Sequence, residues 1–127
     1  MLSELFTDKA SMALSRSLDG FAARHKVIAN NIANAETPGF QRSEVHFEED
    51  LKAAYDTQGT SSAKKKLAEV TPEVSLDTDS PARPDGNNVN IDQEVADLAK
   101  NTLSYKAATT LLESKGSILK YVVTESR

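Results

Sequence analysis

The sequence contains no cysteine and no tryptophan, and only 6% of its residues are aromatic. The absence of cysteine excludes disulfides, thiolate metal sites and a cysteine nucleophile. No segment approaches 18 consecutive apolar residues, so we expect no transmembrane helix and no direct membrane insertion. The first nine residues lack a basic region and an apolar run, which predicts no cleaved secretory signal. Export from the cytoplasm would then need a route that uses no cleaved signal.

The composition favours long helices over a compact globular core. The 127 residues allow at most one compact domain or one elongated hairpin. The net charge of −4 comes entirely from residues 41–86, whereas residues 1–40 and residues 87–127 are each neutral. We therefore predict two terminal packing elements, forming one discontinuous domain, around a solvated loop or linker segment. No basic face for nucleic acid is present.

A first helix is predicted over residues 9–35, because apolar residues recur there at alternating spacings of four and three. The helix must end near Ala35 or Glu36, since the next residue, Thr37, precedes a proline. The predicted seam consists of Leu14, Leu18, Phe21, His25, Ile28, Ile32 and Ala35.

A second helix is predicted from about residue 91 to residue 123, with Asn90 and Gln93 as a capping box. Its seam is Ile91, Val95, Leu98, Thr102, Tyr105, Thr109, Leu112, Gly116, Leu119 and Val123, and Leu103 is a further interface candidate. A second apolar stripe comprises Ala108, Leu111, Ile118 and Val122. The shorter first helix cannot cover both stripes, so the surplus apolar surface predicts contacts with other chains.

The fold class that follows is mainly α, with the terminal helices packed as an elongated coiled-coil-like hairpin. The middle segment is expected to be irregular and partly β. A short strand or helix is predicted within residues 45–55, a flexible stretch over residues 58–66 and an extended strand within residues 69–76. The conformation of residues 56–84 is otherwise left open.

The sequence offers no catalytic constellation. Alternation would place Glu44, His46 and Glu48 on one strand face, which we interpret as a polar outer face rather than a metal site. His25 is predicted to be a packed or hydrogen-bonded interface residue. Phosphate-binding glycine loops and histidine-based metal motifs are absent. We therefore assign no catalytic, cofactor or metal residue, expect no small-molecule substrate and predict that the protein is not an enzyme.

The run Ala29–Phe40 places three asparagines in five residues at the end of the first helix. Asparagine has a low helix propensity, so together they cost about 1.5–2 kcal/mol locally. One interpretation is a frayed helix end. The other is a set of hydrogen-bonding devices, with Asn30 and Asn34 bridging to a neighbouring backbone and Asn31 capping the following turn. The residues alone favour neither interpretation.

The same run closely resembles the N-terminal signature of the bacterial flagellar rod and hook family, with Glu36 in place of Asp and Phe40 in place of Tyr. Residues 85–94 and 98–107 resemble a second pattern, found at the cell-proximal end of the rod, with Lys106 where Gln is common. The two matches cover roughly residues 10–55 and 84–120. The resemblance favours an assembly role for the motif residues Asn30, Asn31, Ile32, Asn34, Thr37, Pro38, Gly39 and Phe40.

The resemblance implies a structural subunit of the proximal rod of the flagellar basal body, in the periplasmic space. Such a subunit is exported by the flagellar type III system, folds on assembly, links the membrane ring and export gate to the distal rod, and transmits torque. Its expected partners are copies of itself, other rod proteins, ring–rod junction proteins and the export gate. The alternatives are a neighbouring rod protein of the same family or, outside it, a cytosolic helical-hairpin adaptor or secretion chaperone.

Overall fold

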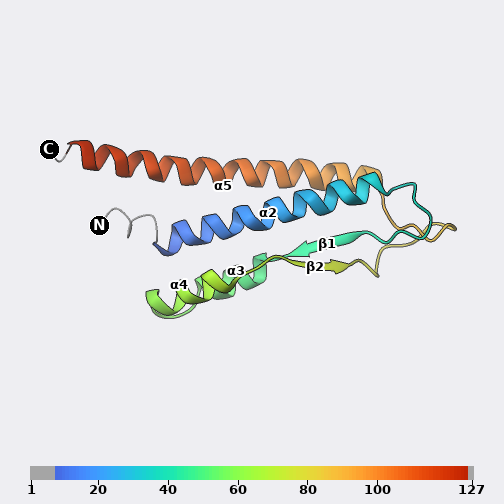
Figure 1. Cartoon of the computed structure of the whole chain (residues 1–127), viewed down its shortest axis with the longest axis horizontal. Helices are drawn as coiled ribbons and strands as arrows, with labels where there is room; N and C mark the ends of the chain where they lie inside the picture. Colours follow the sequence, from blue (N-terminus) through green and yellow to red (C-terminus); the bar gives the residue numbers. More distant parts are fainter. Residues whose placement is uncertain (1–7, 126–127) are drawn as a thin grey trace.

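The computed structural model describes residues 8–125 as an elongated molecule dominated by two long helices (Figure 1). The helices lie side by side, and the middle of the chain forms a smaller layer of two strands and two short helices against α2. The elements in chain order are α2 (Lys9–Ala33), β1 (Ser43–His46), α3 (Glu48–Tyr55), α4 (Thr60–Glu69), β2 (Glu73–Leu76) and α5 (Ile91–Glu125).

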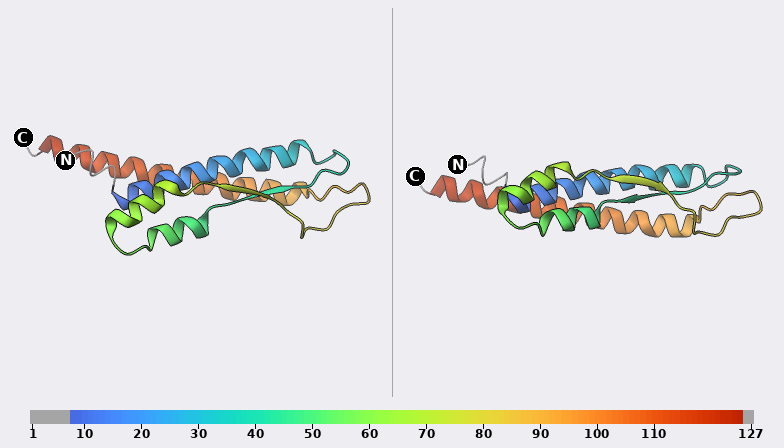
Figure 2. Two further views of the ribbon diagram at one scale, coloured as in Figure 1. Left: turned by 60° about the horizontal axis from the view of Figure 1, so that its bottom comes forward. Right: turned by 90° about the horizontal axis from the view of Figure 1, so that it is seen from below.

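The two terminal helices differ in length, as predicted. The 25 residues of α2 and the 35 residues of α5 correspond to about 38 Å and 52 Å at 1.5 Å per residue. The carboxylate of Asp8 caps α2 by accepting from the Ser11 N–H at 3.1 Å, and it also pairs with Lys115 of α5. Beyond Lys115, α5 projects past the first residues of α2 (Figure 2). The expected helical hairpin with a partly β middle is confirmed.

The middle segment is more regular than the sequence indicated. β1 and β2 form an antiparallel pair in which Val45 lies opposite Val74, which confirms the predicted strand near residue 74. The prediction of a flexible stretch over residues 58–66 is wrong, because α4 occupies most of it. Ala63 and Leu67, one turn apart, are fully buried. Packing against α2 stabilises this helix, which the charged sequence of α4 did not predict.

Phe47 anchors this layer to α2. Its ring packs edge-to-face on Phe21 with the centroids 5.3 Å apart, and the Arg24 guanidinium lies over it. A Cβ on Gly20 would lie 2.5 Å from the Phe47 ring. Gly20 is therefore required for the close approach of Phe47 to α2.

The face that α5 turns toward α2 is partly polar. The buried residues of α5 are Glu94, Asn101 and Ala108, which repeat every seven residues. The exposed fractions of Val95, Leu103 and Tyr105 are 52%, 68% and 43%. The predicted contact of Val95 and Tyr105 with α2 is therefore at most partial. The buried residues of α5 lie beside the predicted seam and not on it.

Candidate functional site

The tip of the molecule is formed by the two motif segments, which hydrogen-bond to each other. The Gly39 N–H donates to the Asp85 carbonyl at 2.8 Å, and the Asn88 N–H donates to the Phe40 carbonyl at 3.4 Å. Gly39 and Gly86 have positive φ angles of 73° and 85°, and a Cβ on Gly86 would lie 3.3 Å from the Gly39 Cα. Both positions favour glycine because of their positive φ angles, and at Gly86 a larger residue would also press against Gly39.

Asn87 closes the end of α2 from the second motif segment. Its fully buried side chain donates to the carbonyls of Asn34 and Thr37 at 2.9 and 2.8 Å and accepts from the Val89 N–H at 2.8 Å. Carbonyls at a helix C-terminus lack partners within the helix, and Asn87 supplies one. The Thr37 turn is thus held by Asn87 and by the Asn34 side chain, and the prediction that Asn31 caps it is wrong.

Asn31 instead joins three elements. Its buried amide donates to the Ser43 carbonyl at 2.9 Å and accepts from the Ser43 N–H at 3.0 Å, as a neighbouring strand would do. The same Nδ2 donates to Glu94 Oε2 of α5 at 3.1 Å. Further along β1, Arg24 donates to the Val45 carbonyl at 2.8 Å. Side chains of α2 therefore satisfy the edge of β1 that faces away from β2.

Arg42 is the centre of the ionic contacts behind the tip. Its guanidinium donates to Glu94 Oε1 and to Asp77 Oδ2, both at 2.7 Å, and also pairs with Glu44. The Arg42 N–H donates to Asn88 Oδ1 at 2.6 Å. We call Asn31, Arg42, Asp77, Asn88 and Glu94 the polar clasp, since together they join α2, β1, the end of β2 and α5.

Hydrogen bonds from Ser80 and then from Arg42 hold the pKa of the Asp77 carboxyl well below its usual range. Burial alone would raise this pKa, and the N–H groups of Asp79 and Ser80 add further to its lowering. Asp77 is therefore ionised wherever the chain is folded at neutral pH. It stays paired with Arg42, which stabilises the clasp.

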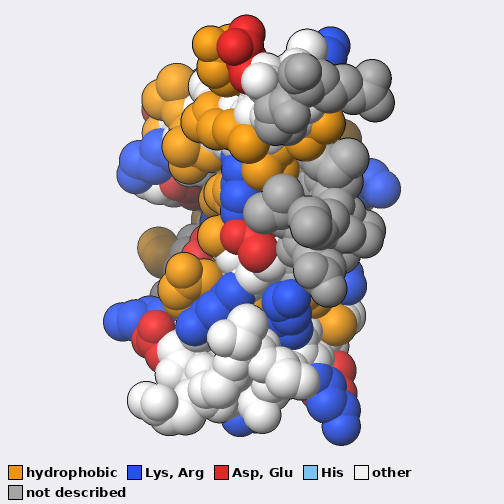
Figure 3. Space-filling model, turned by 90° about the vertical axis from the view of Figure 1, so that its left-hand side faces the viewer, with side chains coloured by type: hydrophobic (Ala, Val, Ile, Leu, Met, Phe, Trp, Pro, Cys, Tyr) orange, Lys and Arg blue, Asp and Glu red, His pale blue; other side chains and the backbone are white. Residues whose placement is uncertain are grey.

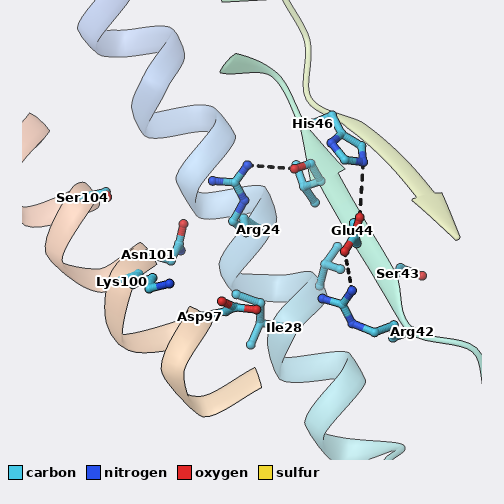
Figure 4. Close-up of a pocket in the computed structure, with 12 residues that line it drawn as sticks. Arg24, Ile28, Arg42, Ser43, Glu44, His46, Asp97, Lys100, Asn101 and Ser104 are labelled. Atoms are coloured by element: carbon cyan, nitrogen blue, oxygen red, sulfur yellow. Dashed lines mark hydrogen bonds and ion pairs between the residues drawn. The ribbon is translucent and has the colours of Figure 1, made fainter. Parts of the chain in front are cut away.

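A groove of about 310 Å³ lies between β1 and α5 with α2 at its floor (Figure 4). Its walls include Arg42, Glu44 and His46 on one side and Asp97 and Lys100 on the other. No nucleophile is paired with a base among these residues. Within residues 8–125 no group of three histidine, cysteine or acidic residues could hold a metal ion. The same residues include no helix with the length and hydropathy to cross a membrane.

An apolar stripe on α5 faces away from α2. Leu103, Leu111, Ile118 and Val122 fall within an arc of about 100° on the helix, and each is at least 57% exposed. We call these four residues the outer stripe. Figure 3, viewed from the end where α5 projects, shows hydrophobic side chains gathered there. Stripes of this kind mark contact surfaces, since isolated soluble proteins seldom expose them.

The comparisons with known proteins agree with the two motifs. The family model described as "Flagella basal body rod protein" matches residues 13–41. The flagellar basal body rod protein FlgB of Borreliella burgdorferi is 36% identical over 110 residues, covering 76% of this chain and 82% of its own length. The chain belongs to the FlgB family. FlgB of Salmonella typhimurium is 35% identical, covering 85% and 88%, and FlgB of Bacillus subtilis is 30% identical, covering 87% and 90%.

FlgB proteins are structural and not enzymatic, so the chain is a structural subunit of the flagellar basal body rod and serves motility. The matched range 13–41 contains most of α2 and the whole first motif. In this FlgB chain the first motif ends α2 and forms half of the tip.

The motif residues have different environments. Asn31 is buried in the polar clasp, Ile32 and Phe40 are half-buried, and Asn30 and Pro38 are exposed. The amide of Asn34 donates to the Asn30 carbonyl of its own helix at 2.9 Å. Asn30 makes no side-chain hydrogen bond with the described residues, so a bridge to another chain remains a prediction for it.

The seam residues also divide. On α2, Ile28 is buried, Leu14, Leu18 and Phe21 are half-buried, and His25 is exposed. On α5, Leu98, Leu112 and Leu119 are half-buried. Sequence reasoning missed the role of every clasp residue, including Asn31, for which it predicted a different contact. The seven-residue spacing of Glu94 and Asn101 could have indicated polar residues on the buried face of α5. A search limited to apolar residues does not detect it.

Proposed function

We propose that this FlgB-family chain is a subunit of the proximal rod that assembles with copies of itself and other rod proteins through α5. The observation that supports this most is the outer stripe, whose side chains the described chain leaves exposed. The tip loops, by contrast, form their hydrogen bonds mostly with other residues of the same chain. The clasp then orients the two helices, and the outer stripe makes contacts between subunits.

We further propose export through the flagellar type III system, followed by folding on assembly in the periplasmic space. Residues beyond Lys115 support this, because Ile118, Tyr121 and Val122 are each more than half exposed on a helix without α2 beside it. An isolated helix of this length is marginal in water. In the dilute monomer we expect hydrogen exchange over residues 116–125 to be nearly unprotected, and in the rod to be slow. Full protection in the monomer would contradict folding on assembly.

In the rod, residues 1–40 and 87–127 would act as one discontinuous helical domain, with residues 41–86 as an excursion from it. The proposed place is next to the membrane ring and export gate, where the subunit would link these parts to the distal rod and transmit torque. The two long helices α2 and α5 lie side by side along the molecule, which suits a subunit that carries axial force and torque.

Electron microscopy of basal bodies from a strain that lacks this gene tests the proposal. We expect ring complexes without a rod, and intact basal bodies after return of the wild-type gene. Intact rods and hooks in the deletion strain would overturn the proposal and would favour a cytosolic helical-hairpin adaptor. A matched control is the same strain carrying the gene with Lys106→Gln, a change at an exposed position outside the outer stripe, which should restore rods.

A further inference from the structure

The outer edge of β2 has no strand beside it. The sheet contains two strands in the order β1–β2, and β2 lies on the side away from α2 and α5 (Figure 1). The side chains of Val74 and Leu76 on this strand are 57% and 60% exposed. A short strand thus presents both a backbone edge and two aliphatic side chains to its surroundings.

The register identifies the backbone groups that are available. The Asp77 N–H donates to the Arg42 carbonyl at 2.9 Å, which makes these two residues a hydrogen-bonded pair. Bonded and non-bonded pairs alternate along an antiparallel ladder, so Ser75 bonds to β1. Val74 and Leu76 therefore direct their N–H and C=O groups away from β1. Among the described residues these groups have no partner.

The opposite edge of the sheet, on β1, is already hydrogen-bonded, so only the edge of β2 is open. On β1 the amide of Asn31 and the guanidinium of Arg24 bond the edge groups of Ser43 and Val45. Proteins usually protect exposed edges with lysine, proline or a bulge. Of these devices β2 has only Pro72, which precedes the strand and leaves its four residues open. The sheet can be extended at β2 and not at β1.

The charge around β2 selects the kind of strand that can be added. Residues 69–79 contain four carboxylates and no lysine or arginine. Asp77 is paired with Arg42, and the other three form no ion pair with the described part of the chain: Glu69, Glu73 and Asp79. The edge therefore attracts a basic segment.

A second copy of this chain fits poorly. Antiparallel pairing of β2 with β2 of another copy would bring together two acidic segments, each with the unpaired carboxylates of Glu69, Glu73 and Asp79. Like charges directly across a strand pair are destabilising.

We propose that β2 binds an extended segment of a different protein as an added antiparallel strand, with apolar residues at alternate positions and lysine or arginine at its ends. Backbone groups of Val74 and Leu76 supply the hydrogen bonds, and the unpaired carboxylates supply the preference for a basic partner. This surface lies on the side of the subunit, apart from the outer stripe. The proposal therefore does not depend on how the helices assemble.

Nuclear magnetic resonance of the full chain with two synthetic peptides tests this proposal. The probe is acetyl-Lys-Val-Thr-Val-Thr-Lys-amide, and its control carries Glu in place of both lysines. With the lysine peptide we expect hydrogen exchange at the Val74 and Leu76 amides to slow by at least about fivefold, while Ser75, already bonded to β1, changes little. The glutamate peptide should leave all three unchanged. Equal effects of both peptides, or no effect at the two edge amides, would overturn the proposal.

A pair of variants separates edge binding from general charge attraction. Leu76→Lys adds a positive charge at the edge and should reduce peptide affinity at least about tenfold, because charged edge residues oppose strand addition. Thr78→Lys adds the same charge at an exposed position beyond the strand and should reduce it no more than about twofold. Equal loss in the two variants, or concentration-dependent dimerisation of the wild-type chain that Leu76→Lys abolishes, would contradict the proposed occupant.

Discussion

The amide of Asn31 on α2 donates to the carboxylate of Glu94 on α5 at 3.1 Å, and both side chains are fully buried. Sixty-three positions separate the two residues, and each lies within a different motif segment. Their contact shows that the first motif acts inside the chain, since Asn31 also binds Ser43. The orientation of the helical hairpin therefore depends on polar contacts at one end as well as on apolar packing along its length.

Glu94→Gln should lower the free energy of unfolding by about 1–3 kcal/mol, the usual size for a lost buried hydrogen bond to a charged group. The variant keeps the side-chain volume and removes the charge that faces Arg42. Urea unfolding followed by circular dichroism measures the change. Glu113→Gln, at an exposed position of the same helix, is the matched control and should have no measurable effect. Equal urea midpoints for both variants would show that the Glu94 contacts of the clasp do not stabilise the fold.

Gly20→Ala should destabilise the chain by about 1–3 kcal/mol through overpacking, despite the better helix propensity of alanine. The added methyl group would meet the Phe47 ring at 2.5 Å and displace it from Phe21. Thermal unfolding measures the effect. Ala22→Val, which adds volume at an exposed position of α2, serves as the comparison. A Gly20→Ala variant at least as stable as the wild type would show that Phe47 does not pack as described.

Acid should unfold the chain partly through Asp77. The folded-state pKa of this carboxyl lies below its unfolded value of about 4, so its contribution to stability is complete above that pH. The contribution is lost as the pH falls from about 4 toward the folded-state pKa. Asp77→Asn should lower stability at pH 7 and flatten the decline in acid. Asp79→Asn, whose carboxylate forms no ion pair with the described residues, is the control for both effects.

The helical frame of this fold could be predicted from the sequence, because heptad spacing and the Thr37–Pro38 stop are local signals. The clasp could not be predicted, since the partners of Asn31, Arg42 and Asn88 come from other segments whose pairing depends on the finished fold. Helix α4 was missed for a related reason. Its lysines and serines are typical of a solvated loop, and only the burial of Ala63 and Leu67 against α2 explains the helix. Part of the outer stripe could be predicted, since Leu111, Ile118 and Val122 belong to the predicted second apolar stripe and are exposed. The placement of Ala108 in that stripe was wrong, because this residue is buried against α2.

Ile28→Asp should abolish motility while export of the subunit continues. Ile28 is 4% exposed on α2, and an unpaired charge at that position would be buried at high cost. Swimming in soft agar, together with detection of the exported protein, gives both results. Ala22→Asp places the same charge at an exposed position of the same helix and should allow assembly. Normal swimming with Ile28→Asp would show that the assigned seam is wrong.

An electron cryo-microscopy reconstruction of the rod in isolated basal bodies, with side chains resolved, would show directly which surfaces of neighbouring subunits touch. We expect neighbouring subunits to cover the outer stripe, Leu103, Leu111, Ile118 and Val122, while the Asn31–Glu94 contact stays within each chain. A rod in which the outer stripe touches no neighbour, or in which Asn31 binds another subunit, would contradict this expectation.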